Sequence, residues 1–409
     1  MIWLVVIVGL LLLIFVHELG HFTVALLVGI RPRSFYIGFP PAIAKIRYKG
    51  IEYGIGAIPL GGFVRIPGMH RPAGHDLEVF LGPALREDPS LAAPMQRVRR
   101  ALEAGDLDAA RDALPGLREA IESATLTPSA RRSANRALRD VDEGTSSDAY
   151  WRQKTWKRVA ALAAGPAANI LVAFVVFFAV YATGAPSQNP STEVGQVEAN
   201  TPAAAAGLHA GDKVVAVDGH PAGTFARVSQ LIRSSDGRPI TVTVHRDGRA
   251  LTLGPRATIR SGGRWIWGFV PAATLVSYPL GHSARLAADD CWLVVVGTVK
   301  AIGALFGGHE HGQLTSTVGI VRVSAAALKV SFNWYLQILA FVSMSLALFN
   351  LLPLLPLDGG HITFSIIEGI RRRAVPREVY ERVSVLGMAF IALITVIAFS
   401  SDFSGGGPH

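Results

Sequence analysis

The chain has 409 residues, of which 50% are hydrophobic, with a mean hydropathy of +0.37 and a formal net charge of +9. The length allows two or three soluble domains, but the apolar residues are gathered in long stretches, which indicates a membrane protein. The basic residues lie beside these stretches, so the charge does not predict nucleic-acid binding, and the single Cys291 excludes an internal disulfide.

Four stretches are long and apolar enough to cross a bilayer, and we place the spans at residues 1–30, 151–184, 334–360 and 383–400. The first has no basic start and no A-x-A-like cleavage site, so we expect a permanent helix and not a signal peptide. A fifth stretch, residues 291–306, is interrupted by Lys300 and follows Asp289 and Asp290. We expect it to be an amphipathic helix on the membrane surface, within an extracytoplasmic linker at 261–333.

The first span contains the sequence His17-Glu18-Leu19-Gly20-His21. On a helix, HExxH places two imidazoles one turn apart on one face, where both can bind Zn²⁺ while the glutamate deprotonates a water. The motif also arises by chance in soluble proteins. Because ionisable groups inside a membrane are costly, their presence in a span points to function.

HExxH supplies two ligands, so a catalytic zinc site needs a third from another segment. The third span ends in Asn350-Leu351-Leu352-Pro353-Leu354-Leu355-Pro356-Leu357-Asp358-Gly359-Gly360-His361. Two prolines interrupt the helix and free backbone groups, which a membrane tolerates only beside protein or a cavity. We therefore expect Asp358 to be the third ligand.

Between the first two spans, residues 51–67 alternate like a strand and are punctuated by glycines, so we predict a β-hairpin region at 31–69. A charged, helix-favouring cytoplasmic insertion follows at 70–150. It could be a helical subdomain that gates or binds a partner. Its many charges and the absence of aromatic residues at 81–149 favour a solvated, mobile insertion instead.

Residues 188–260 combine short β-rich runs with one helical stretch, and residues 201–214 lead into Val217-Asp218-Gly219. This pattern resembles the core of a PDZ domain, which implies capture of an extended peptide by strand addition. The peptide would lie at Val194, Gly195, Gln196 and Val197. The alternative is a small domain that only limits access to the membrane site.

Lys and Arg clusters mark the cytoplasmic side of a membrane protein. One cluster precedes the second span, and another fills the predicted cytoplasmic loop at 361–382. Both termini and the PDZ-like region would then lie outside the cytoplasm, and the basic residues could contact anionic lipids of the bilayer. Residues 401–409 are expected to be a disordered tail.

Together these motifs resemble the site-2 protease family of intramembrane zinc metalloproteases, in particular the bacterial sigma-factor-regulating, RseP-type group. The resemblance implies a polytopic α-helical protein with four transmembrane helices, a membrane-associated β-hairpin and an inserted extracytoplasmic PDZ-like α+β domain, in the bacterial inner membrane. It places zinc on His17, His21 and Asp358, and the general base on Glu18. Residues expected to position substrate are Asn169, Asn350, Pro353, Gly61 and Gly62.

The resemblance also implies the reaction, which is hydrolysis of peptide bonds in or near the membrane segment of single-pass proteins such as anti-sigma factors. The PDZ-like domain would filter these substrates. Two other functions use some of the same features, namely a non-catalytic scaffold and a zinc transporter. The intact HExxH and Asp358 argue against the scaffold, and the few polar groups across the spans argue against a transport path.

Overall fold

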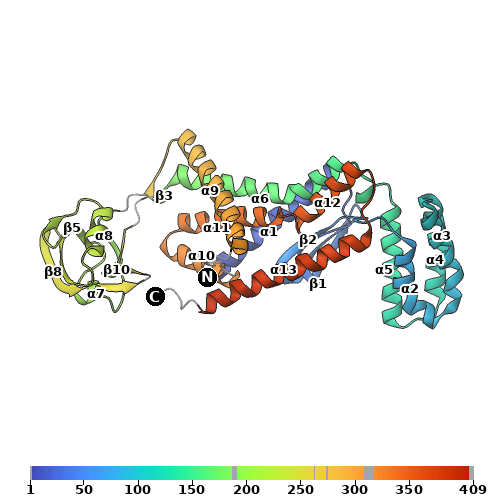
Figure 1. Cartoon of the computed structure of the whole chain (residues 1–409), viewed down its shortest axis with the longest axis horizontal. Coiled ribbons are helices and arrows are strands. Elements are labelled where there is room, and N and C mark those ends of the chain that lie inside the picture. Colours follow the sequence, from blue (N-terminus) through green and yellow to red (C-terminus); the bar gives the residue numbers. More distant parts are fainter. Residues whose placement is uncertain (1, 187–190, 262, 273–274, 308–316, 405–409) are drawn as a thin grey trace.

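The computed structural model describes residues 2–186, 191–261, 263–272, 275–307 and 317–404. Long helices form the middle of the molecule, with a small β domain at one end and a bundle of short helices at the other (Figure 1). Within these described residues, four helices are long and apolar enough to cross a membrane, and the sheets are small and antiparallel, which confirms the predicted fold class. These helices are α1 (Ile2–Leu27), α6 (Thr155–Thr183), α11 (Phe332–Asn350) and α13 (Arg377–Ser404).

Small residues let α1 and α6 pack closely. A Cβ at Gly20 would come within 2.5 Å of the carbonyl oxygen of Ala164, and a Cβ at Gly165 would come within 2.2 Å of His21 Nε2. Close backbone approach through small residues is common between membrane helices, because lipid offers no hydrophobic drive for helix association. The helix that carries HExxH is therefore held directly against α6.

The third span is broken, and its boundaries differ from those expected. α11 ends at Asn350 instead of near residue 360, and α12 (Asp358–Arg371) begins after a turn that contains Pro353 and Pro356. The segment at 361–382 was predicted to be a cytoplasmic loop, but it is mostly helical, because only residues 372–376 separate α12 from α13. Its cytoplasmic position stays a prediction. The predicted tail also begins too early, since α13 continues to Ser404; residues 405–409 lie outside the described part of the chain.

The hairpin region forms strands β1 (Ser34–Tyr48) and β2 (Ile51–Arg65), joined by a turn at Lys49 and Gly50, both with positive φ. Residues 34–37 are paired on both sides, with residues 52–55 and with residues 62–65. We call residues 62–65 the edge strand, because among the described residues no other strand pairs with them. Both strands lie within the hairpin region predicted at 31–69, but the alternating pattern marked only residues 51–67, because Pro40-Pro41 interrupts the alternation in β1.

The segment at 70–150 folds as a helical insertion around its own core, so the preference for a solvated, mobile segment is wrong. Leu81, Leu117 and Ile121 are fully buried between its helices. Alanine and other aliphatic residues at helical spacing supply most of this core, and Phe80 packs against it. The helices are α2 (Gly74–Glu87), α3 (Ala92–Ala104), α4 (Leu107–Ser123) and α5 (Pro128–Thr145), with short 3₁₀ turns η1 (Pro89–Leu91) and η2 (Tyr150–Arg152).

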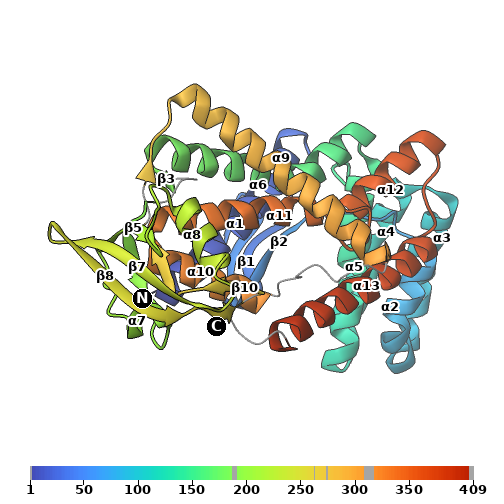
Figure 2. The same ribbon diagram turned by 60° about the vertical axis from the view of Figure 1, so that its left-hand side comes forward.

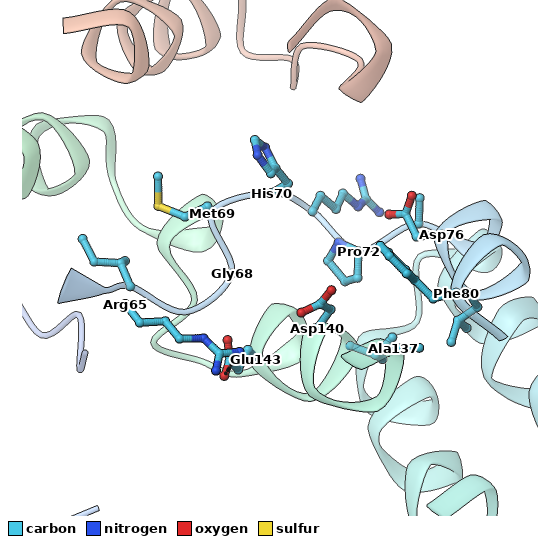
Figure 3. Close-up of a pocket in the computed structure, with 15 residues that line it drawn as sticks. Arg65, Gly68, Met69, His70, Pro72, Asp76, Phe80, Ala137, Asp140 and Glu143 are labelled. Atoms are coloured by element: carbon cyan, nitrogen blue, oxygen red, sulfur yellow. Dashed lines mark ion pairs between the residues drawn. The ribbon is translucent and has the colours of Figure 1, made fainter. Parts of the chain in front are cut away.

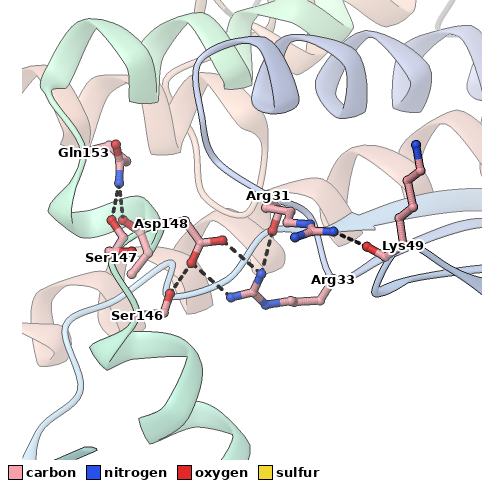
Figure 4. A network of polar contacts seen from close by, with 8 residues as sticks. Arg31, Arg33, Lys49, Ser146, Ser147, Asp148 and Gln153 are labelled. Carbon is pink, nitrogen blue, oxygen red and sulfur yellow. Dashed lines mark hydrogen bonds and ion pairs between the residues drawn. The ribbon is translucent and has the colours of Figure 1, made fainter.

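Polar contacts fix the end of this insertion to the hairpin (Figure 4). Arg33 forms a bidentate ion pair with Asp148, with nitrogen–oxygen distances of 2.9 and 3.1 Å, and Ser146 also donates to Asp148. Burial opposes ionisation of Asp148, yet the hydrogen bonds from Ser146 and Arg33 lower its pKa. The carboxylate is therefore charged at neutral pH and holds the insertion against β1.

The β domain contains a four-stranded sheet in the order β6-β5-β7-β8 and a separate pair, β4 with β11. It extends beyond the predicted boundary of residue 260, because Trp267 is buried in its core and β11 pairs with β4. We call residues 191–272 the PDZ-like domain. Its elements are β4 (Val194–Val197), α7 (Pro202–Ala205), β5 (Lys213–Val217), β6 (His220–Pro221), α8 (Phe225–Arg233), β7 (Pro239–Arg246), β8 (Arg249–Ala257), β9 (Ile259–Ser261), β10 (Arg264–Ile266) and β11 (Phe269–Pro271).

Short strands β3 (Ala185–Pro186) and β12 (Leu275–Val276) pair where the chain leaves and rejoins the long helices. The predicted linker at 261–333 is largely helical, with α9 (Leu280–Gly307) and α10 (Thr317–Val330). α9 packs on α6 (Figure 2). Tyr181 of α6 donates a 2.6 Å hydrogen bond to Asp290 of α9. A position of residues 291–306 on the membrane surface stays a prediction.

Asp212 is the polar centre of the PDZ-like domain. Its side chain is 1% exposed, and both of its oxygens accept 2.6 Å hydrogen bonds from Arg246. These bonds from Arg246 lower the pKa of Asp212. The ion pair therefore stabilises the folded domain fully above the pKa of Asp212 in the unfolded chain, about 3.9. This stabilisation is lost as the pH falls through the lower pKa of Asp212 in the folded domain.

We expect Asp212→Asn to lower the free energy of opening of this domain at pH 7 by about 2–4 kcal/mol, because it leaves Arg246 without its charged partner. Hydrogen–deuterium exchange of residues 194–271 in the full chain measures this. Asp247→Asn is the control, since Asp247 lies in an exposed turn at positive φ that asparagine tolerates. Equal exchange in the two variants would contradict the assignment.

Candidate metal centre

Three side chains from two helices converge inside the helical layer. His17 and His21 lie one turn apart on α1 and are both buried, with their Nε2 atoms 3.2 Å apart. Asp358, the first residue of α12, places Oδ2 3.2 Å from each of these nitrogens. The structure thus brings together the three residues that the sequence predicted as metal ligands.

The donor atoms fit a zinc ion. Ligands held about 2.0–2.1 Å from a tetrahedral zinc ion lie about 3.3–3.4 Å from one another, which is close to the 3.2 Å sides of this triangle. Asp358 Oδ2 is buried without a hydrogen-bond donor, and an acceptor in that state requires a cation or a proton. Two imidazoles and one carboxylate are also a donor set that zinc prefers.

The other ring nitrogens have partners that orient the imidazoles. His21 Nδ1 lies 2.9 Å from the carbonyl oxygen of Ala161, to which it can donate, and this leaves Nε2 for a metal. Asn169 Nδ2 lies 3.4 Å from His17 Nδ1, while Asn169 Oδ1 has no partner. Rotating this amide by 180° would let Oδ1 accept from His17 Nδ1–H and would satisfy both groups.

Glu18 lies on the side of α1 that faces the edge strand. A Cβ at Gly62 would come within 3.0 Å of Glu18 Cγ, so glycine is required for this approach. Gly61 faces the opposite way, against the ring of Phe39. Glu18 is thus held between the histidines and the edge strand.

A cavity of about 410 Å³, which we call the site cavity, opens beside these residues. Of the residues expected to position substrate, Asn350 and Gly62 line it, whereas Gly61 and Pro353 do not. Asn169 is fully buried behind His17 and does not line it either. Residues that the sequence analysis did not identify are Val64, Arg65, Ile66, Met69 and His361. Only the pairing of the hairpin could have revealed Val64 and Arg65.

Two glycines and a buried ion pair hold α12 in place. A Cβ at Gly359 or Gly360 would come within 2.5 Å of backbone atoms in the preceding turn. Arg158 on α6 donates to Glu368 on α12 at 2.6 Å, and both side chains are largely buried. These contacts set the position from which Asp358 reaches the histidines.

Comparison with known proteins identifies the family. Residues 5–394 match the model of peptidase family M50. The chain belongs to that family. It is 30% identical to a protein of Agrobacterium fabrum named as a zinc metalloprotease, Atu1380, over 96% of this chain and 93% of the other. It is 27% identical to Eep, named as a protease, of Enterococcus faecalis, over 96% of each chain. It is 26% identical to the regulator of sigma-W protease RasP of Bacillus subtilis, over 95% of each.

The predicted site-2 protease relationship is thereby confirmed. This M50 protein is a multi-pass membrane protein and a zinc metalloprotease. The prediction of an enzyme holds against the alternatives of a scaffold and a zinc transporter. Membership of the family also implies that the substrates are membrane proteins.

We expect Glu368→Gln to lower the free energy of unfolding by about 3–5 kcal/mol, because it leaves the buried Arg158 without a charged partner. Thermal unfolding in detergent micelles measures the change. Glu378→Gln is the control, since Glu378 is exposed in the first turn of α13. The charge-swapped double variant Arg158→Glu with Glu368→Arg restores an ion pair, so it should be more stable than Glu368→Gln. A small loss of stability in Glu368→Gln, with no gain in the double variant, would contradict the role of the pair.

Proposed function

We propose that the protein hydrolyses peptide bonds in or near the transmembrane segment of single-pass membrane proteins. The observation that supports this most is the 3.2 Å donor triangle on helices α1 and α12, next to a strand edge that is free for pairing. A soluble substrate would not need a metal centre among apolar helices. The name of the relative RasP refers to regulation of sigma-W, so we infer that anti-sigma factors are among the substrates, in regulated intramembrane proteolysis.

His17, His21 and Asp358 would hold zinc through Nε2, Nε2 and Oδ2. Zinc bound there supplies a Lewis acid that polarises the scissile carbonyl and makes water a better nucleophile at neutral pH. Glu18 takes the proton from the attacking water and returns it to the leaving nitrogen. Asn169 keeps the His17 ring oriented, and α12 keeps Asp358 in reach. We therefore assign Asn169 to positioning a ligand and not to contact with substrate.

The edge strand would bind the substrate as an extended chain. A transmembrane helix hides its carbonyl groups in its own hydrogen bonds, so cleavage requires local unwinding. Residues 62–65 have a free edge in the described chain and lie beside Glu18. Strand addition satisfies the backbone groups that unwinding exposes. The hairpin thus offsets part of the cost of unwinding and places the scissile bond next to Glu18.

We infer the orientation from the basic residues. Arg152, Lys154, Lys157 and Arg158 lie at the start of α6, beside the helical insertion. Lys and Arg favour the cytoplasmic side, so the insertion would be cytoplasmic in a bacterial inner membrane. The PDZ-like domain lies at the other end of the long helices (Figure 1) and would be extracytoplasmic, as would both termini.

The PDZ-like domain would select substrates, but the structure changes the strand that we propose for peptide binding. β4, with Val194, Gly195, Gln196 and Val197, pairs with β11 on one side. On the other side Val194 exchanges backbone hydrogen bonds with Gly211 and Asp212, so this strand has no free edge at Val194. In the described residues β11 pairs with β4 alone, and Phe269 contacts Phe225 of α8. The edge of β11, on the side of α8, is therefore our candidate for binding an extracytoplasmic peptide.

We expect Glu18→Gln to lower the cleavage rate about 10²–10⁴-fold while zinc stays bound, because Glu18 would be the proton acceptor and not a ligand. The measurement is cleavage of a single-pass reporter in reconstituted bilayers, with metal content determined on the same sample. Asp358→Ala is the contrasting variant, for which zinc should be lost. Wild-type rates with Glu18→Gln would refute this mechanism.

Removal of the PDZ-like domain should relax selection between full-length and extracytoplasmically shortened substrates, because a bulky ectodomain would no longer be excluded. Residues 191–272 are a suitable deletion, since β3 and β12 pair with each other next to both cut ends. The ratio of the two cleavage rates is the measurement. The same deletion with Glu18→Gln is the inactive control. A ratio equal to that of the intact protein would argue against a filter.

A further inference from the structure

The site cavity must supply a hydrogen-bond donor for the reacting carbonyl, besides the metal ligands and Glu18. Peptide hydrolysis turns the scissile carbonyl oxygen into an oxyanion, and donors aimed at that oxygen lower the barrier. Asn169 was expected to position substrate, but it is fully buried behind His17 and does not line the cavity. The donor therefore has to come from the residues that do line it.

Apart from the metal ligands, three side chains on the cavity wall carry N–H donors, namely Arg65, Asn350 and His361. Arg65 is held by a 2.9 Å ion pair with Glu143 of the helical insertion. Asn350 Nδ2 donates to the carbonyl oxygen of Leu346 in its own helix, at 3.1 Å. In the part of the chain that the structure describes, neither ring nitrogen of His361 has a hydrogen-bond partner. His361 is thus the unengaged donor of this wall.

His361 lies next to the groups that would carry out the reaction. It follows Asp358 by three positions on α12, a spacing that puts two side chains on one face with their Cβ atoms about 5–6 Å apart. Both residues line the site cavity together with Glu18. The imidazole of His361 therefore borders the same space as the proposed general base and the metal ligands.

An aromatic contact orients the ring of His361. It stacks on Tyr380 of α13, with ring centroids 6.4 Å apart and an angle of 30° between the planes. Tyr380 is itself buried and contacts Phe364 of α12 at a centroid distance of 4.3 Å. A donor whose ring is held by packing is preorganised for a developing charge.

His70 contacts the same tyrosine from another direction. Its ring lies 4.8 Å from that of Tyr380. It belongs to the loop after β2 and lines a different cavity, of about 250 Å³, between this loop and helices α2 and α5 (Figure 3). His70 does not line the site cavity. The chain thus contains two histidines that pack on one tyrosine, of which only His361 borders the metal centre.

The proposed binding mode brings a carbonyl group towards α12. A peptide strand paired with residues 62–65 directs its backbone groups alternately towards the edge strand and away from it. A carbonyl that points away from the edge strand faces the part of the cavity lined by Leu357, Asp358 and His361. Such a carbonyl has no partner in the hairpin, so its donor must come from the side of α12.

We propose that His361 donates a hydrogen bond from its imidazole to the scissile carbonyl oxygen as this oxygen becomes negative. The inference rests on the proposed proteolytic function. Attack by water forms a C–O bond and moves the carbonyl π electrons onto oxygen, while Glu18 takes the water proton. Collapse then breaks the C–N bond, and Glu18 passes that proton to the leaving nitrogen. His361 keeps its own proton throughout and stabilises the oxyanion between these steps.

The test uses the full chain in bicelles and a single-pass reporter whose cleavage site is mapped by mass spectrometry. We expect His361→Ala to lower kcat about 10²–10³-fold, the usual cost of removing one oxyanion donor. KM should change by less than about twofold, because the bond becomes strong only in the transition state. Wild-type kcat in His361→Ala would overturn the proposal.

Two binding measurements separate this role from a structural one. In the Glu18→Gln background, His361→Ala should leave the affinity for the uncleaved reporter unchanged. In the otherwise wild-type protein, the same substitution should weaken binding of a phosphinic peptide by about 10²-fold, since its tetrahedral anionic group resembles the intermediate. Equal losses for reporter and phosphinic peptide would show a ground-state or packing effect and would overturn the proposal.

The matched control is His70→Ala, which removes the other histidine that packs on Tyr380. Its kcat should stay within about threefold of wild type, as for a change outside the reacting site. A loss as large as that of His361→Ala would show that packing on Tyr380 is what matters, and it would overturn the donor role.

Replacement by amides tests the donor directly. His361→Asn and His361→Gln place an amide N–H near the positions of Nδ1 and Nε2, and one of them should be at least about tenfold faster than His361→Ala. Zinc content is measured on every sample and should equal that of wild type, because His361 is not a proposed ligand. Loss of zinc in all three variants, or no recovery by either amide, would overturn the proposal. If wild-type protein with bound zinc does not cleave the reporter, the proposed function fails as well; cleavage that is insensitive to His361 refutes the donor role alone.

Discussion

The structure depends on one electrostatic constraint, the approach of three electron-rich atoms to 3.2 Å inside an apolar layer. Two imidazole nitrogens and a carboxylate oxygen do not gather in such a place without a cation, because the carboxylate charge would lack both water and a partner. A zinc ion bound there would neutralise the carboxylate, and its bonds to the three atoms would offset the cost of burying them. Much of the packing around the site keeps these atoms together. Gly20 and Gly165 bring α1 against α6, and the turn before α12 aims Asp358 at α1.

The broken third span follows from the same constraint. A continuous helix through residues 334–360 would carry Asp358 past the metal centre along its own axis. The break at Asn350 lets a new helix start at Asp358, where its backbone N–H groups favour a carboxylate. Gly359 and Gly360 allow the preceding turn to lie against α12. The backbone break and the two glycines therefore determine where the carboxylate of Asp358 lies.

The sequence predicted the metal ligands and the general base better than it predicted strand pairing and the packing of the insertion. HExxH identifies His17, Glu18 and His21, and the broken end of the third span identifies Asp358, because the residue types that bind zinc reflect chemical need directly. The spans follow from hydropathy. In contrast, the bounds of β1 within the predicted hairpin region were not found, because Pro40-Pro41 interrupts its alternating pattern and its pairing partners are set by the fold. The core of the insertion was not predicted either, because the sequences of alanine-rich helices look alike whether the helices are packed or exposed to solvent. The pairing of β4 with β11 joins residues more than 70 positions apart, which local patterns do not reveal.

The backbone bonds from Tyr150 and Trp151 to Pro67 and Gly68 close the helical insertion at its base. The chain leaves β2 and returns to α6 at nearly the same point, where these two hydrogen bonds join the incoming and outgoing segments. The roughly 80 residues between them fold around a core of their own. Such a unit can be lengthened, replaced or lost while the two strands of chain beneath it keep their positions. The insertion beside the metal centre can therefore change without refolding of the helices that hold the metal ligands. Two backbone hydrogen bonds thus allow the insertion to vary independently of the helices that carry the metal ligands.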